Sequence, residues 1–299
     1  MRQEANMRPA EISELAKINE TVHYIQNKLD GRRPSVALVL GSGLGDLADQ
    51  VTDPVKISFG DIPHFPISTV EGHAGQIVIG NLEGKCVVVM QGRFHYYEGY
   101  TMKQVVFPIY VMNQLGATCL VITNAAGGMN RSFRAGDLML IEDHLNLTGD
   151  NPLIGPNHEE LGVRFPDMSN AYDPQYRELA LHIAKDLKGS ANEPLYLKQG
   201  VYCGITGPTY MTPAELKMLA TLGGDAVGMS TVAEVIAARH CGFRILGISC
   251  ITDMAIGDSL EPLTHEQVVA VANRTKPMFS ALVRGFIAEV KWGKYWDLK

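Results

Sequence analysis

Cysteine is scarce in this chain, and its pattern excludes two common roles. The 299 residues include five cysteines, an odd number, and no two of them form a C-x-x-C pair. This arithmetic argues against a disulfide framework and against a zinc knuckle. Cys119 lies inside an apolar run, as most of the others do, which predicts buried free thiols in a reducing cytosol.

Long hydrophobic runs are also missing. The first residues, 1–6, contain no apolar signal core, and the longest uncharged apolar runs are too short for a membrane span. We therefore expect a cytoplasmic protein that does not contact a membrane.

Positive charge is in short supply. Lysine and arginine total 26 against 32 acidic residues, for a formal net charge of −6. Nucleic-acid binding needs a basic face, so this balance disfavours it, although a local cationic site for a small anion remains open. Metal-ligand spacings, internal repeats and domain linkers are lacking too, which predicts one domain without a metal site. With 46% hydrophobic residues the chain can bury a sizeable core.

Hydrophobic periodicity predicts an α/β protein. A helical pattern opens the chain over 11–30, and buried strands alternate with helices from there to the C-terminus, which favours a sandwich with a largely parallel sheet. Stretch 144–172 lacks clear periodicity, and a loop of that length is usually functional or involved in assembly. The expected strands are 35–40, 76–79, 86–90, 119–123, 138–141, 196–203 and 244–251, and the expected helices are 102–115, 173–187, 212–222, 231–240 and 265–290.

A glycine-rich loop follows the first expected strand. Segment 41–46 reads GSGLGD, in which glycines allow close backbone approach to a ligand and Ser42 adds a hydroxyl donor. This suits a phosphate, and a plain strand-to-helix turn remains the alternative. The dinucleotide spacing G-x-G-x-x-G fails because position 46 is Asp46, and no P-loop follows.

Basic and aromatic side chains gather after the strand 86–90. Arg93, His95 and Tyr97 alternate, so an extended backbone would project all three to one side. Arginine matches phosphate geometry, and histidine adds a further donor. This trio predicts an anion site.

The remaining strand ends carry further candidates. Small residues at 123–128 would let a ligand lie against backbone at the sheet edge. Asp253 ends a very apolar strand, where an idle carboxylate would be costly. Tyr210 precedes a helix and suits stacking on a planar ligand, while His265 opens the last helix.

Two helix starts have a structural explanation. Thr212 with Glu215, and Thr231 with Glu234, fit the capping-box pattern. Ser230 stands next to the second cap, where it would also face a ligand anion at the helix start.

Taken together, these segments resemble the trimeric purine nucleoside phosphorylase family, which includes the methylthioadenosine phosphorylases. The resemblance covers the chain from about residue 35 to its end and implies one α/β domain, 31–299, with a mixed central sheet and a helix over 1–30 packed on it. The matching motifs are LGSGLG (40–45), GHAG (72–75), QGRFH (91–95), TNAAGG (123–128), DHLN (143–146), GP (207–208) and AVGMST (226–231).

The resemblance implies phosphorolysis, in which inorganic phosphate displaces a purine from a pentose and no cofactor or metal takes part. It implies a homotrimer in which Phe165 reaches the site of a neighbouring subunit. The implied catalytic residues are His95, Asp253 and His265. The implied phosphate ligands are Ser42, His73, Arg93, His95, the Ala125 amide and Ser230. The implied nucleoside contacts are Tyr97, Tyr210, Met211, Met229, Asp253, His265 and Phe165.

Two residues depart from the pattern of the 6-oxopurine enzymes. These enzymes carry glutamate where Met211 stands and asparagine where Asp253 stands. Methionine accepts hydrogen bonds only weakly, and an ionised aspartate would accept from a 6-amino group but repel an oxo group. The pattern predicts a preference shifted toward 6-aminopurine nucleosides, although Ala255 replaces the second aspartate of the methylthioadenosine branch.

Four other functions stay in view. A methylthioadenosine phosphorylase is the alternative within the same family. A nucleoside hydrolase is the nearest rival from another class, with the same sugar chemistry and water in place of phosphate. A non-catalytic nucleoside-binding protein would keep the motifs without turnover. An NAD-dependent oxidoreductase is disfavoured by the failed glycine spacing.

Overall fold

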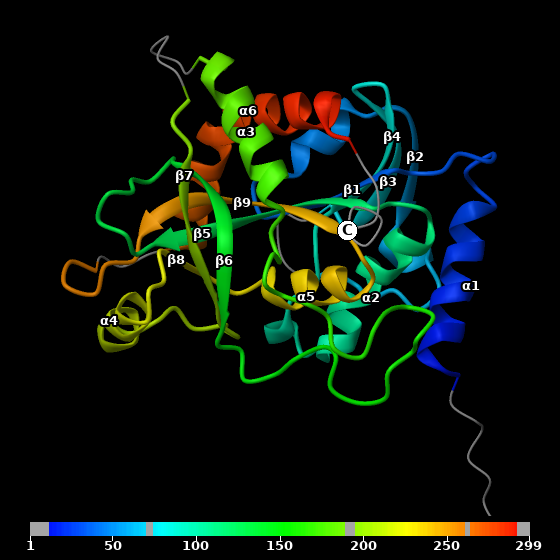
Figure 1. Cartoon of the computed structure of the whole chain (residues 1–299), viewed down its shortest axis with the longest axis horizontal. Coiled ribbons are helices and arrows are strands. Elements are labelled where there is room, and N and C mark those ends of the chain that lie inside the picture. The colour runs from blue at the N-terminus through cyan, green and yellow to red at the C-terminus, as the bar shows by residue number, and fades with distance from the viewer. Residues whose placement is uncertain (1–11, 70–73, 189–194, 261–263, 292–299) are drawn as a thin grey trace, which may run out of the picture.

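The computed structural model describes residues 12–69, 74–188, 195–260 and 264–291 (Figure 1). Its strands are β1 (Val36–Leu40), β2 (Thr52–Ser58), β3 (Gln76–Leu82), β4 (Lys85–Gln91), β5 (Cys119–Gly128), β6 (Leu138–Asn146), β7 (Lys198–Gly204), β8 (Ala226–Gly228) and β9 (Arg244–Met254). Its α-helices are α1 (Glu14–Gln26), α2 (Met102–Gln114), α3 (Pro174–Asp186), α4 (Pro213–Thr221), α5 (Val232–His240) and α6 (His265–Glu289).

One mixed sheet joins all of these strands. Their order is β2-β3-β4-β1-β5-β8-β7-β6-β9, and β9 also pairs with β5, so the last five strands close into a ring. Pairing is parallel for β1 with β4 and β5, for β5 with β9, and for β7 with β6 and β8. It is antiparallel for β3 with β2 and β4, for β5 with β8, and for β6 with β9. The mixed sheet is confirmed, and the largely parallel sheet expected from the alternation alone is wrong.

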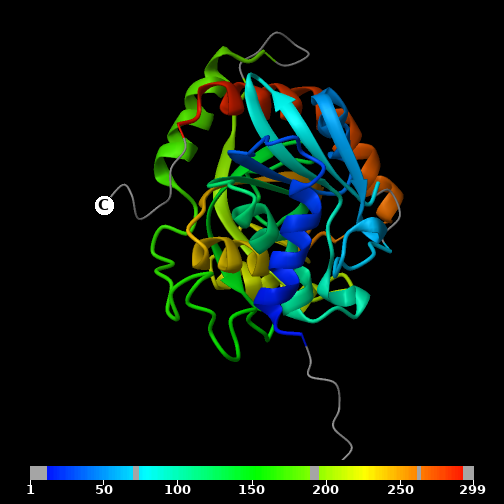
Figure 2. The same ribbon diagram turned by 90° about the vertical axis from the view of Figure 1, so that its right-hand side faces the viewer.

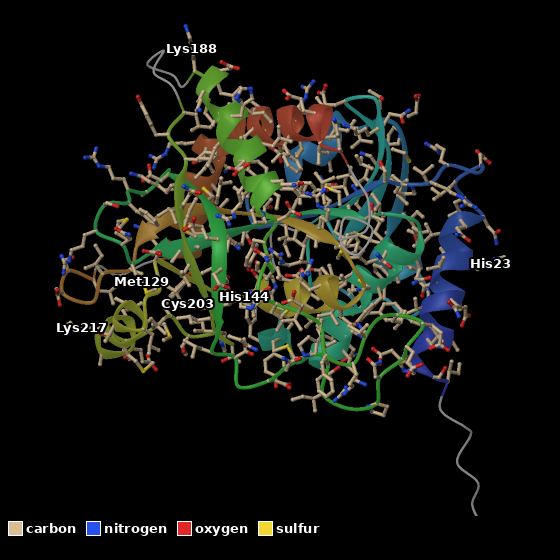
Figure 3. All side chains as sticks on the ribbon, in the orientation of Figure 1. His23, Met129, His144, Lys188, Cys203 and Lys217 are labelled. Atoms are coloured by element: carbon tan, nitrogen blue, oxygen red, sulfur yellow. The ribbon has the colours of Figure 1, made fainter. Side chains whose placement is uncertain are left out.

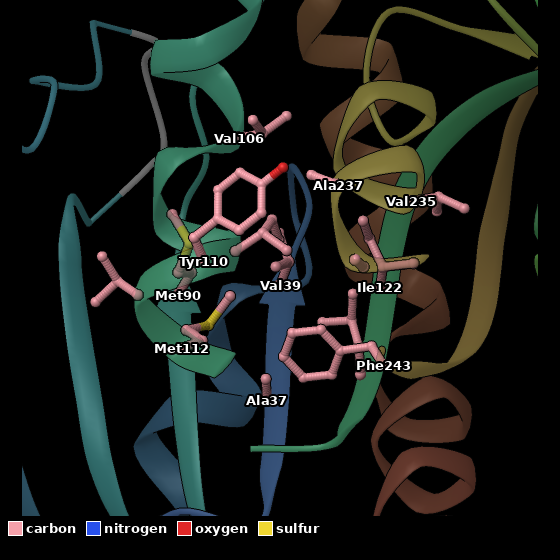
Figure 4. Close-up of a cluster of buried hydrophobic side chains, with 14 of the residues drawn as sticks. Ala37, Val39, Met90, Val106, Tyr110, Met112, Ile122, Val235, Ala237 and Phe243 are labelled. Carbon is pink, nitrogen blue, oxygen red and sulfur yellow. The ribbon is translucent and has the colours of Figure 1, made fainter. Parts of the chain in front are cut away.

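Helices cover both faces of the sheet. Figure 1 and the turned view of Figure 2 show α3 and α6 on one side and α1, α2 and α5 on the other. The central strands between them are apolar because both of their faces are covered, and β1 is buried at every position. In Figure 4, Tyr110 of α2 and Ala237 of α5 approach Val39 and Ile122 on the sheet. Helix α1 adds Ile18 and other buried residues to the same cluster.

A smaller cluster lies at the ring. Met129, Cys203 and Leu216 pack there with α4. Figure 3 places Met129 and Cys203 on the side of the molecule that carries α4, opposite His23 on α1. Cys119, Cys203, Cys241 and Cys250 are buried, Cys86 is partly buried, and all five are free thiols.

Several elements differ from the sequence-based expectation. β2 and the three-residue β8 were not expected, and β5 runs to Gly128, so segment 123–128 is strand rather than a turn. A short 3-10 helix, Gly45–Gln50, follows the glycine loop. The stretch 144–172 was expected to lack regular structure, but residues 144–146 belong to β6, and only 147–172 contain no helix or strand.

The division into 1–30 and 31–299 stays a prediction, although the chain forms a single domain. Within the ranges that the structure describes, no helix has the length and apolar character needed to cross a membrane.

Candidate active site

A cavity of about 940 Å³ opens where β1, β4, β5, β8 and β9 end, with α6 along one side. Ends of neighbouring strands are where open α/β sheets collect ligands. The cavity gathers most of the predicted site, namely Ser42, Arg93, His95, Tyr97, Ala125, Tyr210, Met211, Met229, Ser230 and Asp253. The guanidinium of Arg93 and the hydroxyls of Ser42 and Ser230 therefore share one space.

Three predicted residues are not placed in this cavity. Phe165 is 87% exposed on the loop 147–172 and does not line it. His73 lies outside the described residues. His265 begins α6, as expected, but its side chain also lies outside what the structure describes.

Arg93 is fixed by a buried ion pair. It follows β4 and is only 1% exposed. Its Nη2 and Nε donate to the Glu234 carboxylate at 2.9 and 3.3 Å, and Nη1 donates to the Thr123 carbonyl at 2.5 Å. Glu234 also accepts from the Thr231 N–H at 2.8 Å, so one carboxylate caps α5 and orients the guanidinium. Such a bidentate pair adds geometric precision to its charge.

His95 is positioned by Glu98. The Glu98 carboxylate lies 3.0 Å from His95 Nδ1 and accepts the His95 backbone N–H at 2.7 Å. Burial alone would raise the pKa of Glu98, but hydrogen bonds from His95 and Thr69 outweigh it and lower the pKa to about 2. The His95 ring stacks on Tyr97 with centroids 4.7 Å apart. Burial raises the pKa of Tyr97 to about 12, so Tyr97 stays a neutral phenol at physiological pH.

The loop that carries Ser42 depends on close backbone packing. A Cβ at Gly41 would lie 2.8 Å from Asn124 Cα, so only glycine lets β1 end this close to β5. The Gly41 N–H donates to Thr123 Oγ1 at 3.1 Å, which fixes the loop's first residue. Ser42 is thereby held beside the end of β5.

The Ser230 turn is strained. Thr231 has a φ of +73°, which non-glycine residues rarely adopt and which clusters at functional sites. Asn124 Nδ2 donates to Thr231 Oγ1 at 2.9 Å and stabilises this turn. Asn124 Oδ1 is buried without a hydrogen-bond partner among the described residues, so it can accept from a ligand hydroxyl.

The other end of the cavity is apolar apart from Asp253. Ile205, Leu216, Val227 and Ala255 line this end. Burial raises the pKa of Asp253, while the hydroxyl of Thr252, which donates to its Oδ1 at 2.9 Å, opposes the shift. A carboxyl in such surroundings can keep a proton that it donates to a substrate.

Sequence reasoning missed Glu98, Glu234, Asn124 and the wall formed by α6. The sequence explained Glu234 as a helix cap. The capping-box pattern does not indicate that the same carboxylate also accepts hydrogen bonds from Arg93, 141 residues away. Within the described ranges, no three His, Cys, Asp or Glu side chains are grouped so as to hold a metal ion.

Comparison with known proteins identifies the family. The model of the phosphorylase superfamily matches residues 35–288. Purine nucleoside phosphorylase 1 of Bacillus subtilis is 54% identical over 273 residues, which cover 91% of this chain and 98% of that protein. The Schistosoma mansoni purine nucleoside phosphorylase in complex with adenosine superposes with a TM-score of 0.85 at 40% identity, covering 92% of this chain and 98% of that one. The complex of the same protein with inosine gives the same TM-score and identity, and the superposition covers 93% of this chain and 97% of that one.

A buried arginine, flanking serine hydroxyls and an apolar recess meet in one cavity of a fold shared with these proteins. The chain belongs to the phosphorylase superfamily and, within it, to the purine nucleoside phosphorylase family.

Proposed function

We propose that this protein catalyses the phosphorolysis of purine nucleosides and deoxynucleosides, releasing the free base and the pentose 1-phosphate. The observation that carries the proposal is the two-part cavity. One part presents donors for an oxyanion at Ser42, Arg93 and Ser230, and the other is apolar with a single carboxyl, Asp253. Its substrates would be a purine nucleoside and inorganic phosphate, without a metal or other cofactor.

The donors would hold phosphate below the sugar. Ser42, Arg93, His95, the Ala125 N–H and Ser230 would bind its oxygens, together with His73. Arg93 needs no reorganisation to do so because Glu234 and Thr123 already fix its orientation. Donors that are fixed before the reaction act strongly on developing charge.

The bond changes then follow from charge. The bond between the anomeric carbon and purine nitrogen 9 breaks, its electron pair leaves with the base, and a phosphate oxygen forms the new bond to that carbon. Positive charge develops on the sugar, and the bound phosphate anion stabilises it. Asp253, with its pKa raised by burial, would donate its proton to nitrogen 7 of the departing base.

The nucleoside would extend from the sugar site to the apolar part of the cavity. Tyr97, Tyr210 and Met229 would contact the ribose, and His265 would bind its 5′-hydroxyl. Met211 and Asp253 would contact the base, which the surrounding apolar side chains separate from water.

The base preference is proposed to lean toward 6-aminopurines. Met211 is a weak acceptor for the ring N–H of a 6-oxopurine, and the carbonyl oxygen of the Asp253 carboxyl would accept from a 6-amino group while its O–H faces nitrogen 7. The S. mansoni relative is described with adenosine as well as with inosine, which supports a pocket able to hold both base types.

The proposed assembly is a cytoplasmic homotrimer in which Phe165 covers the site of a neighbouring subunit. The high exposure of Phe165, on a loop without regular structure, supports this role. The same loop also exposes Ile154 and Val163, and protein interfaces form where apolar surface gathers.

A base-release assay tests the function. Inosine, adenosine, their 2′-deoxy forms and 5′-methylthioadenosine are incubated with and without phosphate, and free base and pentose 1-phosphate are quantified. We expect release only with phosphate, with adenosine turned over at least as fast as inosine. Strongly preferred inosine would refute the shifted preference, and preferred methylthioadenosine would move the protein to that branch. Release without phosphate indicates a hydrolase, and tight nucleoside binding without turnover indicates a binding protein.

A further inference from the structure

One face of α6 forms a wall of the cavity. Gln267, Ala270, Val271 and Arg274 line it at helical spacing, so they share one side of the helix. Arg274 is the last of them and is exposed. The structure gives its side chain no ion pair or hydrogen bond with any residue that it describes.

Helix α6 also contacts the glycine loop, on a face next to this wall. A Cβ at Gly43 would lie 2.5 Å from Ala272 Cβ, and Gly43 itself has a φ of +75°. The loop therefore packs on α6 at Ala272, the residue after Val271 of the cavity wall. Ser42, next to Gly43, lines the cavity together with Arg274.

The charges around the proposed phosphate site nearly cancel without Arg274. The charge of Arg93 is balanced by Glu234 at 2.9 Å, and the ionised Glu98 lies 3.0 Å from His95. Arg93 and Arg274 are the two arginines among the described residues that line the cavity, and no lysine lines it there. A phosphate dianion would meet little net positive charge from the remaining groups.

We propose that Arg274 draws the phosphate dianion to the glycine-loop end of the cavity and contributes to its binding. This inference rests on the proposed function, because it takes phosphate to be the co-substrate. An exposed cation at a cavity rim acts mainly by steering, which speeds association and weakens as salt screens it.

Steady-state kinetics of Arg274→Gln with varied phosphate tests this role. We expect the KM for phosphate to rise about fivefold, as loss of one partly screened charge would give, while kcat and the nucleoside KM stay within about twofold. Wild-type kcat/KM for phosphate should fall with added NaCl, and the variant's should fall less steeply. Arg274→Lys keeps the charge and should retain most of the affinity.

Arg134→Gln is the matched control, because Arg134 is exposed and does not line the cavity, and the substitution removes the same charge. Its phosphate KM should equal that of the wild type. Titration calorimetry with inorganic phosphate measures the phosphate affinities of the wild type and these variants without turnover, and they should fall in the same order. Unchanged phosphate KM, affinity and salt slope in Arg274→Gln would overturn the role of Arg274 alone. A wild type that releases base without phosphate would instead contradict the proposed function.

Discussion

At the scale of single residues, the site combines groups that sequence reasoning found with groups that it could not find. Arg93, Ser42 and Ser230 were identifiable because their residue types suit an oxyanion and their segments follow strands. Glu234 and Arg274 were not, because their roles depend on side chains that meet across the fold. No local pattern records a partner 141 residues away.

Asp253→Asn tests the proposed base preference. An amide can donate to an oxo group and cannot carry a negative charge, so the ratio of inosine to adenosine turnover should rise about tenfold. Parallel kcat/KM measurements on both nucleosides check this ratio. A ratio equal to that of the wild type would show that Asp253 does not select the base.

The same variant tests the raised pKa of Asp253. Burial makes the folded protein hold this proton more tightly than the unfolded chain does. That stabilisation is complete below the unfolded pKa and is lost as pH rises through the folded pKa. Asp253→Asn cannot ionise, so its Tm should exceed that of the wild type near neutral pH, and the gap should close in acid. Thermal unfolding scans over a pH series measure this difference in Tm. A difference that stays constant with pH would contradict a raised pKa of Asp253.

Glu234→Ala should leave Arg93 as an uncompensated buried charge. We expect the free energy of unfolding to fall by about 3–5 kcal/mol, measured by urea denaturation. Glu142→Ala is the control, because it removes a carboxylate from a more exposed pair with Arg177 and should cost less than about 1 kcal/mol. Equal losses in both variants would remove the special role of the buried pair.

At the scale of elements, the helices were more predictable than the strands. Five helical patterns follow the apolar spacing closely, from α2 to α6. β8 has three residues, too few for any periodicity, and β2 is mostly exposed, so its sequence lacks an apolar run. β5 was cut short because Asn124 and the glycines resemble a turn, whereas pairing with β9 keeps them extended. Tertiary pairing outweighed local propensity there.

Gly41→Ala tests the close approach of β1 to β5. The added Cβ would lie 2.8 Å from Asn124 Cα and 2.9 Å from the Thr123 carbonyl oxygen, both backbone atoms. We expect a stability loss of about 1–3 kcal/mol and a raised phosphate KM, because the displaced loop carries Ser42. Gly60→Ala is the control, since its Cβ would meet only Ser58 Oγ at 3.9 Å. Denaturation curves and phosphate kinetics on both variants decide the point.

At the scale of the whole molecule, the central prediction is the trimer. Analytical ultracentrifugation should give a mass of three chains of 32.7 kDa each. Phe165 lies outside its own subunit's cavity and is proposed to cover the nucleoside of a neighbouring subunit. Phe165→Ala should therefore raise the nucleoside KM severalfold, and it should leave the phosphate KM unchanged because no phosphate contact is lost. A monomer with full activity, or an unaffected nucleoside KM, would contradict the shared site.

The wide sequence span of the cavity wall has a consequence for biosynthesis. The wall draws on residues from Ser42 to Arg274, and β9 and α6 are made after every other strand and helix of the described residues. A nascent chain still lacking α6 has neither this wall nor the part of the sheet cover that α6 supplies beside α3. Stalled ribosome complexes should therefore acquire ligand affinity only when nearly all of the polypeptide has left the exit tunnel.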